Sequence, residues 1–140
     1  MKRKLNRVVL IDDDLLTNKI NTRIIEKLEL SEEIVAFQNA KLALAYLQEK
    51  LPSGEFPQPD LIFLDINMPI MNGWEFLDAY QHIKPEQKAN QILMMLTSSP
   101  SPEDQQKAQQ YQIVNGYLEK PLRIDMVLDV IIKYFPDLQK

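Results

Sequence analysis

The chain alternates short runs of apolar residues with longer stretches in which apolar and polar residues recur at helical spacing. Five runs are short and almost free of polar residues, which is typical of buried strands. They cover residues 8–11, 34–37, 61–64, 92–96 and 116–118. A proline-rich segment, residues 52–59, predicts a loop, because proline continues neither a helix nor a central strand.

The stretches between these runs predict five helices. The first has an apolar residue at every fourth position, which predicts one apolar stripe: Leu16, Ile20, Ile24 and Leu28, with Ile25 beside them. Asp14 is expected to cap this helix. The second helix contains Leu42, Leu44, Ala45 and Leu47, with Asn39 as its expected cap.

The third predicted helix starts after the break at Asn72-Gly73 and runs through residues 74–80. A polar fourth helix opens at Pro102, a residue suited to the first helical position. The last helix has a continuous apolar face: Met126, Val127, Val130, Ile131 and Tyr134. Five strands alternating with five helices predict one α/β domain over residues 1–140, with a doubly wound parallel sheet and helices on both faces.

Composition narrows the classes of function. The 140 residues include no cysteine, which excludes disulfides, cysteine-ligated metals and a thiol nucleophile. No apolar run approaches the roughly 20 residues of a membrane helix, and three aspartates follow the first run where a signal peptide would stay apolar. The net charge of −4 argues against non-specific binding to nucleic acid or to an acidic membrane.

Acidic, hydroxyl or cationic side chains follow four of the five predicted strands, and in a parallel sheet these ends meet at one edge. The remaining strand is followed by Gln38 and Asn39, which carry no charge. The first strand is followed by three aspartates, Asp12, Asp13 and Asp14. Asp65 follows the third strand, Thr97 the fourth and Lys120 the fifth. Two carboxylates about 5 Å apart repel by roughly 3 kcal/mol at an effective dielectric of 20, so cations are needed. Lys120 supplies one positive charge, and Mg²⁺ is the natural second partner. A carboxylate can also accept a phosphoryl group, whose oxygens Thr97 and Lys120 could then contact.

These residues lie in four segments that resemble the motifs of response-regulator receiver domains, the phosphoacceptors of two-component signalling. The segments are residues 8–14, 64–73, 95–98 and 116–121, in the family's order. The second, Leu-Asp-Ile-Asn-Met-Pro-Ile-Met-Asn-Gly, is highly specific on its own. The resemblance covers nearly the whole chain and implies a flavodoxin-like strand order, 2-1-3-4-5.

The resemblance implies a role for each site residue. Asp65 is the phosphoacceptor, and Mg²⁺ is bound by Asp12, Asp13, Asp65 and the backbone carbonyl of Asn67, with Asp13 the more direct ligand. Thr97 and Lys120 contact the phosphoryl group. Tyr117 is the aromatic residue whose rotamer couples to Thr97, and the Lys120–Pro121 bond is cis in most of the family.

The resemblance also implies partners. A histidine kinase or a histidine phosphotransfer protein donates the phosphoryl group, and an unknown protein target responds to it in the cytoplasm. The protein is expected to be a monomer or a weak homodimer that catalyses only its own phosphorylation and dephosphorylation. No output domain is expected, because the last predicted helix ends near Phe135.

Three other functions fit the sequence less well. A haloacid-dehalogenase-like phosphatase needs a second aspartate where Asn67 stands. A module that binds partners without phosphorylation would not need the complete acidic set. A flavodoxin-like cofactor site lacks its phosphate-binding first loop. Two departures from the family pattern are Ser98, where a small residue is usual, and a long segment at residues 50–59.

Overall fold

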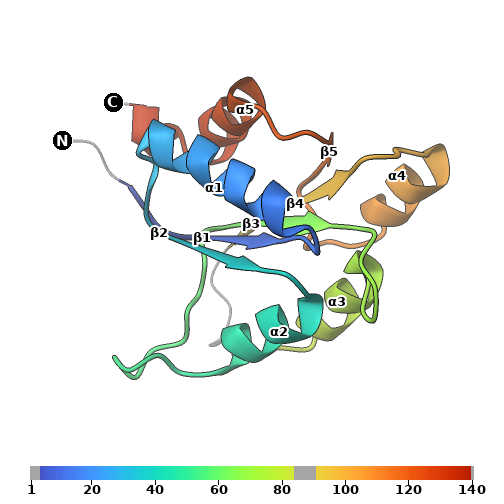
Figure 1. Ribbon diagram of the computed structural model, residues 1–140, viewed down its shortest axis with the longest axis horizontal. Helices are drawn as coiled ribbons and strands as arrows, with labels where there is room; N and C mark the ends of the chain where they lie inside the picture. The colour runs from blue at the N-terminus through green and yellow to red at the C-terminus, as the bar shows by residue number, and fades with distance from the viewer. Residues whose placement is uncertain (1–3, 84–90, 140) are drawn as a thin grey trace.

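The computed structural model describes residues 4–83 and 91–139 (Figure 1). Within these ranges, five parallel strands form one sheet in the order β2-β1-β3-β4-β5. The strands are β1 (Leu5–Ile11), β2 (Ser31–Phe37), β3 (Leu61–Asp65), β4 (Ile92–Thr97) and β5 (Gly116–Glu119). This arrangement confirms both the predicted fold class and the predicted strand order.

Helices cover both faces of the sheet, as Figure 1 shows. The described ranges contain α1 (Leu15–Leu28), α2 (Ala40–Gln48), α3 (Gly73–Tyr80), α4 (Pro102–Gln109) and α5 (Ile124–Tyr134), followed by the short 3-10 helix η2 (Pro136–Gln139). Apolar residues of α1 and α5 pack on one face, whereas those of α2, α3 and α4 pack on the other.

The two cores are built from alternate residues of the same strands. In β3, which is buried along its whole length, Ile62 and Leu64 face the core under α2 and α3. Leu61 and Phe63 face the core under α1 and α5. This explains the apolar runs in the sequence, because a parallel strand covered on both faces has no polar side.

Strands β1 and β2 each begin three residues before their predicted start. All of the added residues except the buried Leu5 are polar, yet the two strands are paired there, with Leu5 opposite Ser31 and Arg7 opposite Glu33. The apolar-run criterion misses such positions, because backbone pairing continues where the side chains reach solvent.

The apolar stripe predicted for α1 is wrong in its first half. Leu16 and Ile20 are 63% and 49% exposed, and the buried residues of the helix are Asn18, Asn21 and Ile25. An α-helix turns about 100° per residue, so residues spaced by four drift about 40° around it at each step. The stripe therefore reaches the core only near its end.

Helix caps were predicted correctly. The side chains of Asp14 and Asn39 accept hydrogen bonds from the amides of Leu16 and Leu42, respectively. Pro102 lies in the first turn of α4, which Ser101 caps.

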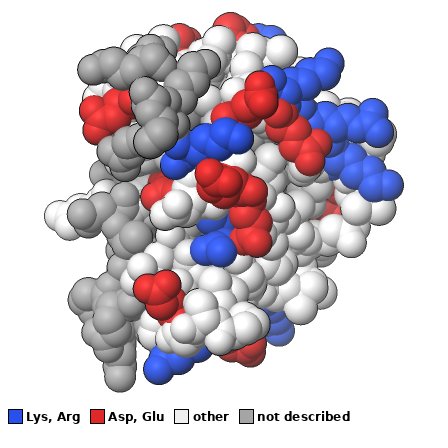
Figure 2. Space-filling model, turned by 90° about the vertical axis from the view of Figure 1, so that its left-hand side faces the viewer, with Lys and Arg blue, Asp and Glu red and all other residues white. Residues whose placement is uncertain are grey.

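The proline-rich segment is a loop, as predicted, and the guanidinium of Arg7 donates to the carbonyl of Pro57 within it. Acidic and basic side chains are interspersed on the side of the molecule where the strands begin (Figure 2). Across residues 4–83 and 91–139, no helix has both the length and the apolarity to cross a membrane.

Candidate functional site

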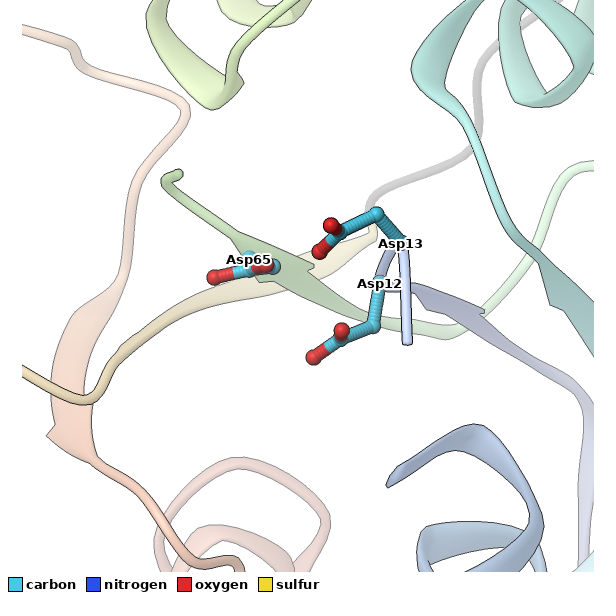
Figure 3. Close-up of side chains that lie close together, drawn as sticks. All are labelled: Asp12, Asp13 and Asp65. Atoms are coloured by element: carbon cyan, nitrogen blue, oxygen red, sulfur yellow. The ribbon is translucent and has the colours of Figure 1, made fainter. Parts of the chain in front are cut away.

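Three carboxylates meet at the carboxyl edge of the sheet. Ile11 of β1 lies opposite Leu64 of β3, so the residues that follow, Asp12 and Asp65, are neighbours across the strand pair. Together with Asp13 they place one carboxylate oxygen each within 4.8 Å of one another (Figure 3). The grouping predicted from the strand ends is therefore present in the structure.

Lys120 brings a positive charge to this group from the end of β5. Its Nζ lies 2.6 Å from Oδ2 of Asp12 and 3.1 Å from Oδ1 of Asp65. Its backbone amide donates to the carbonyl of Thr97, which holds the loop after β5 against the end of β4. Burial alone would lower the pKa of the ammonium group, but the hydrogen bond and charge of Asp12, and then Asp65, outweigh it and raise that pKa. Lys120 therefore stays charged as the bridge between two carboxylates.

Asp65 lies in a setting that disfavours its negative charge. Its side chain is almost fully buried. Burial, and after it the negative charge of Asp12, raise the pKa of Asp65 to about 6, although Lys120 and the amide of Asn67 act in the opposite direction. A carboxylate in this setting gains more from an added cation than an exposed one, because water does little to stabilise its charge.

Asp12 and Asp13, which follow β1, differ in the partners of their carboxylate groups. Oδ1 of Asp12 accepts from the amide of Asp14, and its Oδ2 pairs with Lys120. Asp13 is exposed, and no hydrogen bond or ion pair engages its side chain within the described part of the chain. The carboxylate of Asp13 is thus the one left open toward solvent.

The hydroxyl of Thr97 lies at the end of β4, next to β3. Thr97 is fully buried, and its Oγ1 accepts from the amide of Ser99. On β5 the hydroxyl of Tyr117 is buried close to Thr97 and Ser101. Burial, and then the charge of Asp104, raise the pKa of that hydroxyl. Thr97 and Tyr117 are therefore neighbours, while the coupling of the Tyr117 rotamer to Thr97 stays a prediction.

The loop after β3 is folded tightly against the end of that strand. The amide of Asn67 is 3.4 Å from Oδ1 of Asp65, while the Asn67 side chain is exposed. The amide of Gly73 donates to the carbonyl of Ile66, and a Cβ atom at Gly73 would lie 2.8 Å from the carbonyl oxygen of Asp65. Asn72-Gly73 was predicted as a break before the third helix and as the end of the second family motif, but this close approach was not predicted.

Asn18 was also missed. It lies on the buried side of α1, and its side-chain amide donates to the carbonyls of Asp12 and Phe37. Nothing in the local sequence distinguishes it from a surface asparagine, because its partners are carbonyl groups of two separate strands.

The donor set fits Mg²⁺. All candidate ligands are hard oxygen atoms, which this ion prefers. Mg²⁺ is usually bound through one or two carboxylates and keeps several of its water ligands. Three carboxylates against one ammonium group leave an excess of negative charge in a partly buried place. The Lys120–Pro121 peptide bond at its rim is cis.

Comparison with known proteins gives a consistent result. Residues 8–132 match the family described as the response regulator receiver domain. The chain is 36% identical over 95 residues to a protein-glutamate methylesterase/protein-glutamine glutaminase of Desulfotalea psychrophila, covering 68% of this chain but 24% of that protein. It is 26% identical over 113 residues to Response regulator Rcp1 of Synechocystis, covering 81% of this chain and 75% of that one. The chain thus spans about a quarter of the length of the first of these relatives.

Solved structures show the same architecture. A two-component response regulator from Cytophaga hutchinsonii superposes with a TM-score of 0.82 at 37% identity, covering 94% of this chain and 97% of that one. The bacteriophytochrome response regulator RtBRR superposes with a TM-score of 0.73 at 27% identity, covering 97% of this chain and 79% of that one.

Proposed function

The chain belongs to the response regulator receiver domain family, and from this premise we propose that it accepts a phosphoryl group on Asp65 and signals through the change of conformation that follows. One observation carries the proposal. The ammonium group of Lys120 contacts Asp12 and Asp65 together, in a cluster where Asp13 remains open. This arrangement suits a carboxylate that must be ionised, held in place and approached by an anionic group.

The transfer step follows from the chemistry of Asp65. The donor is a phosphohistidine on a histidine kinase or on a histidine phosphotransfer protein. A carboxylate oxygen of Asp65 forms a bond to phosphorus as the bond from phosphorus to the histidine nitrogen breaks, and that nitrogen keeps the electron pair. The product is an aspartyl phosphate, in line with carboxylate nucleophiles elsewhere.

The surrounding residues stabilise the product. Lys120, which contacts the Asp65 carboxylate, would move to a phosphoryl oxygen, and Thr97, at the end of the neighbouring strand β4, would donate its hydroxyl to another. Asp12, Asp13, Asp65 and the backbone carbonyl of Asn67 would hold Mg²⁺. The bound ion would supply positive charge that offsets the repulsion between the carboxylates and the incoming phosphoryl group.

The readout is a shift between two conformations. Hydrogen bonds to charged groups contribute roughly 1.5–3 kcal/mol each. Moving an equilibrium from 1:99 to 99:1 takes about 5.5 kcal/mol, so contacts from Thr97 and Lys120 together are of the right size. Tyr117 lies beside Thr97, and α4 follows Thr97 after a short loop. Tyr117 and α4 are therefore expected to respond. The responding partner is a protein, in the cytoplasm, and the domain acts as a monomer or a weak homodimer.

Phosphorylation by acetyl phosphate with Mg²⁺, followed by intact-mass measurement, tests the proposal. We expect the mass of one phosphoryl group to be added, and this gain to be absent without Mg²⁺ and in Asp65→Asn. Asp14→Asn is the matched control, because Asp14 caps α1 and asparagine caps equally well. Phosphorylation that persists in Asp65→Asn, or that is lost in Asp14→Asn as well, would contradict the assignment.

A further inference from the structure

Helix α1 is oriented differently from what its apolar residues predict. Its first half turns Leu16 and Ile20 to solvent and buries Asn18 and Asn21 instead. A buried asparagine inside a helix is unfavourable unless its polar atoms are needed, because it loses water and gives no apolar contact. Asn18 is 3% exposed, so its contacts should explain the orientation.

Asn18 joins the ends of two strands. One nitrogen, Nδ2, lies 2.9 Å from the carbonyl oxygen of Asp12 and 3.1 Å from that of Phe37. The same Phe37 carbonyl also accepts from the amide of Asp12, 3.0 Å away. Both hydrogens of the side-chain amide are thus donated at the point where β1 ends and the acidic loop begins.

The backbone of Asn18 adds a third link to the same loop. Its amide donates to the carbonyl of Asp14, 3.1 Å away. Asp14 in turn donates its own amide to Oδ1 of Asp12. Asn18 therefore fixes the loop before Asp13 through Asp12 and after it through Asp14, although it does not reach the carboxylates itself.

The use of the amide supports a donor role. Oδ1 of Asn18 is buried and accepts no hydrogen bond from the residues that the structure describes. The side chain thus leaves its acceptor unsatisfied while both donor hydrogens are used. No side chain of similar size matches it: aspartate has no donor for two carbonyls, leucine is apolar, and serine has one short donor.

We propose that Asn18 is a positioning residue of the acidic site, holding the loop Asp12–Asp13–Asp14 in the geometry that binds a divalent cation. The inference rests on the magnesium site of the proposed function. Groups behind the ligands of a metal orient them, and removing such a group lowers metal affinity by roughly 10- to 100-fold. Asn18 holds this position behind Asp12 and Asp13.

The test uses Asn18→Leu, with Asn21→Leu as the matched control. Asn21 is the other buried asparagine of α1, and its side chain forms no hydrogen bond to the acidic loop in the described ranges. Mg²⁺ affinity is measured by calorimetry, and exchange of the Asp12 and Asp14 amides by NMR on the metal-free protein. Thermal unfolding of both variants accounts for any general loss of stability.

We expect Asn18→Leu to raise the Mg²⁺ dissociation constant by roughly tenfold or more and to speed exchange at both amides. Asn21→Leu should alter neither, whatever it does to the melting temperature. Asn18→Ser keeps one donor and should give an intermediate change, which preserves the test if the leucine variant does not fold.

Unchanged Mg²⁺ affinity and unchanged exchange in the Asn18 variants would overturn the proposal, as would equal effects in the Asn21 control. Neither readout requires phosphorylation, so failure of Asp65 to accept a phosphoryl group would leave this test intact. A wild-type protein that binds no Mg²⁺ would overturn the proposal together with the magnesium site, and amide exchange would then report only whether Asn18 fixes the loop.

Discussion

Helices α3 and α4 are equally long, eight residues each, but they are attached to the sheet in different ways. Helix α3 follows the strand that ends in Asp65, and it buries Gly73, Trp74, Phe76, Leu77 and Tyr80. Helix α4 follows the strand that ends in Thr97, and it buries only Ala108. Both helices have a capped first turn, so capping does not account for the difference.

The difference suggests separate roles for the two helices, with α3 positioning the site and α4 changing conformation. Under the proposed function, phosphoryl transfer needs an acceptor whose position is fixed, and α3 together with its tight loop would provide that for Asp65. A conformational signal needs an element that few contacts hold, since such elements open at low free energy. The lightly attached α4, next to Thr97, meets this second requirement.

The largest loss of stability should come from truncating a buried side chain of α3. Phe76 is fully buried and stacks on Tyr80, so Phe76→Ala should destabilise the protein by about 3–5 kcal/mol in urea unfolding. Ala108→Gly, at the buried position of α4, should cost about 1 kcal/mol. Similar losses for the two variants would mean that α4 is held as firmly as α3.

The second test uses pH, because the buried charge lies on the side of the site that α3 supports. The pKa of Asp65 is about 6 in the folded protein and near 3.8 when unfolded. Between these values the unfolded chain ionises first, so metal-free stability should fall, by roughly 1–3 kcal/mol, as pH rises from about 4 to 6.

The Asp65→Asn variant isolates this contribution. Above pH 6 it should be more stable than the metal-free wild type, and this advantage should vanish near pH 4. Thermal unfolding with a chelator measures both curves. An advantage independent of pH would show that the charge of Asp65 is not its source.

A third test probes the close approach of α3 to the acceptor strand. In Gly73→Ala the new Cβ would meet the backbone of Asp65 and Ile66 at 2.8 and 2.9 Å, which neither can easily avoid. We expect a loss of about 1–3 kcal/mol and slower phosphorylation. Gly116→Ala is the control, because its Cβ would meet the flexible side chain of Met94. An equal loss in the control would argue against a special role for this contact.

The smallest effect should come from the link between the two helices. Tyr111, just after α4, stacks on Trp74 and donates its hydroxyl to Asp78 of α3, 2.8 Å away. Tyr111→Phe keeps the ring and removes this hydrogen bond, so the free energy of unfolding should fall by about 0.5–1 kcal/mol. Hydrogen exchange should quicken in α4 and not in α3. Equal acceleration in both helices would indicate that they open together.

The sequence was sufficient for the strands and the gathering of polar residues at their ends. Asp12, Asp65, Thr97 and Lys120 each follow an apolar run, and a parallel sheet brings such positions together. It was insufficient for α1, where the spacing of Leu16 and Ile20 indicated an inward face. The orientation of α1 is set by the two carbonyl groups to which the Asn18 side chain donates. These carbonyl groups lie at the ends of β1 and β2, and only the folded sheet brings them together.

The close approach at Gly73 was hidden for a similar reason. An asparagine–glycine pair marks a helix start equally well whether or not a strand lies within 3 Å of it. Only the packed position of Asp65 shows why a side chain would not fit there.

The strand order has a consequence for how this domain can be shared between proteins. β1 leads into α1 on one face of the sheet, and β3 leads into α3 on the other, while their ends meet at the acidic cluster (Figure 1). A protein seated over α1 and α5 therefore leaves α2, α3 and α4 uncovered. Under the proposed function, a phosphodonor protein and a target protein can therefore occupy opposite faces of the sheet at the same time.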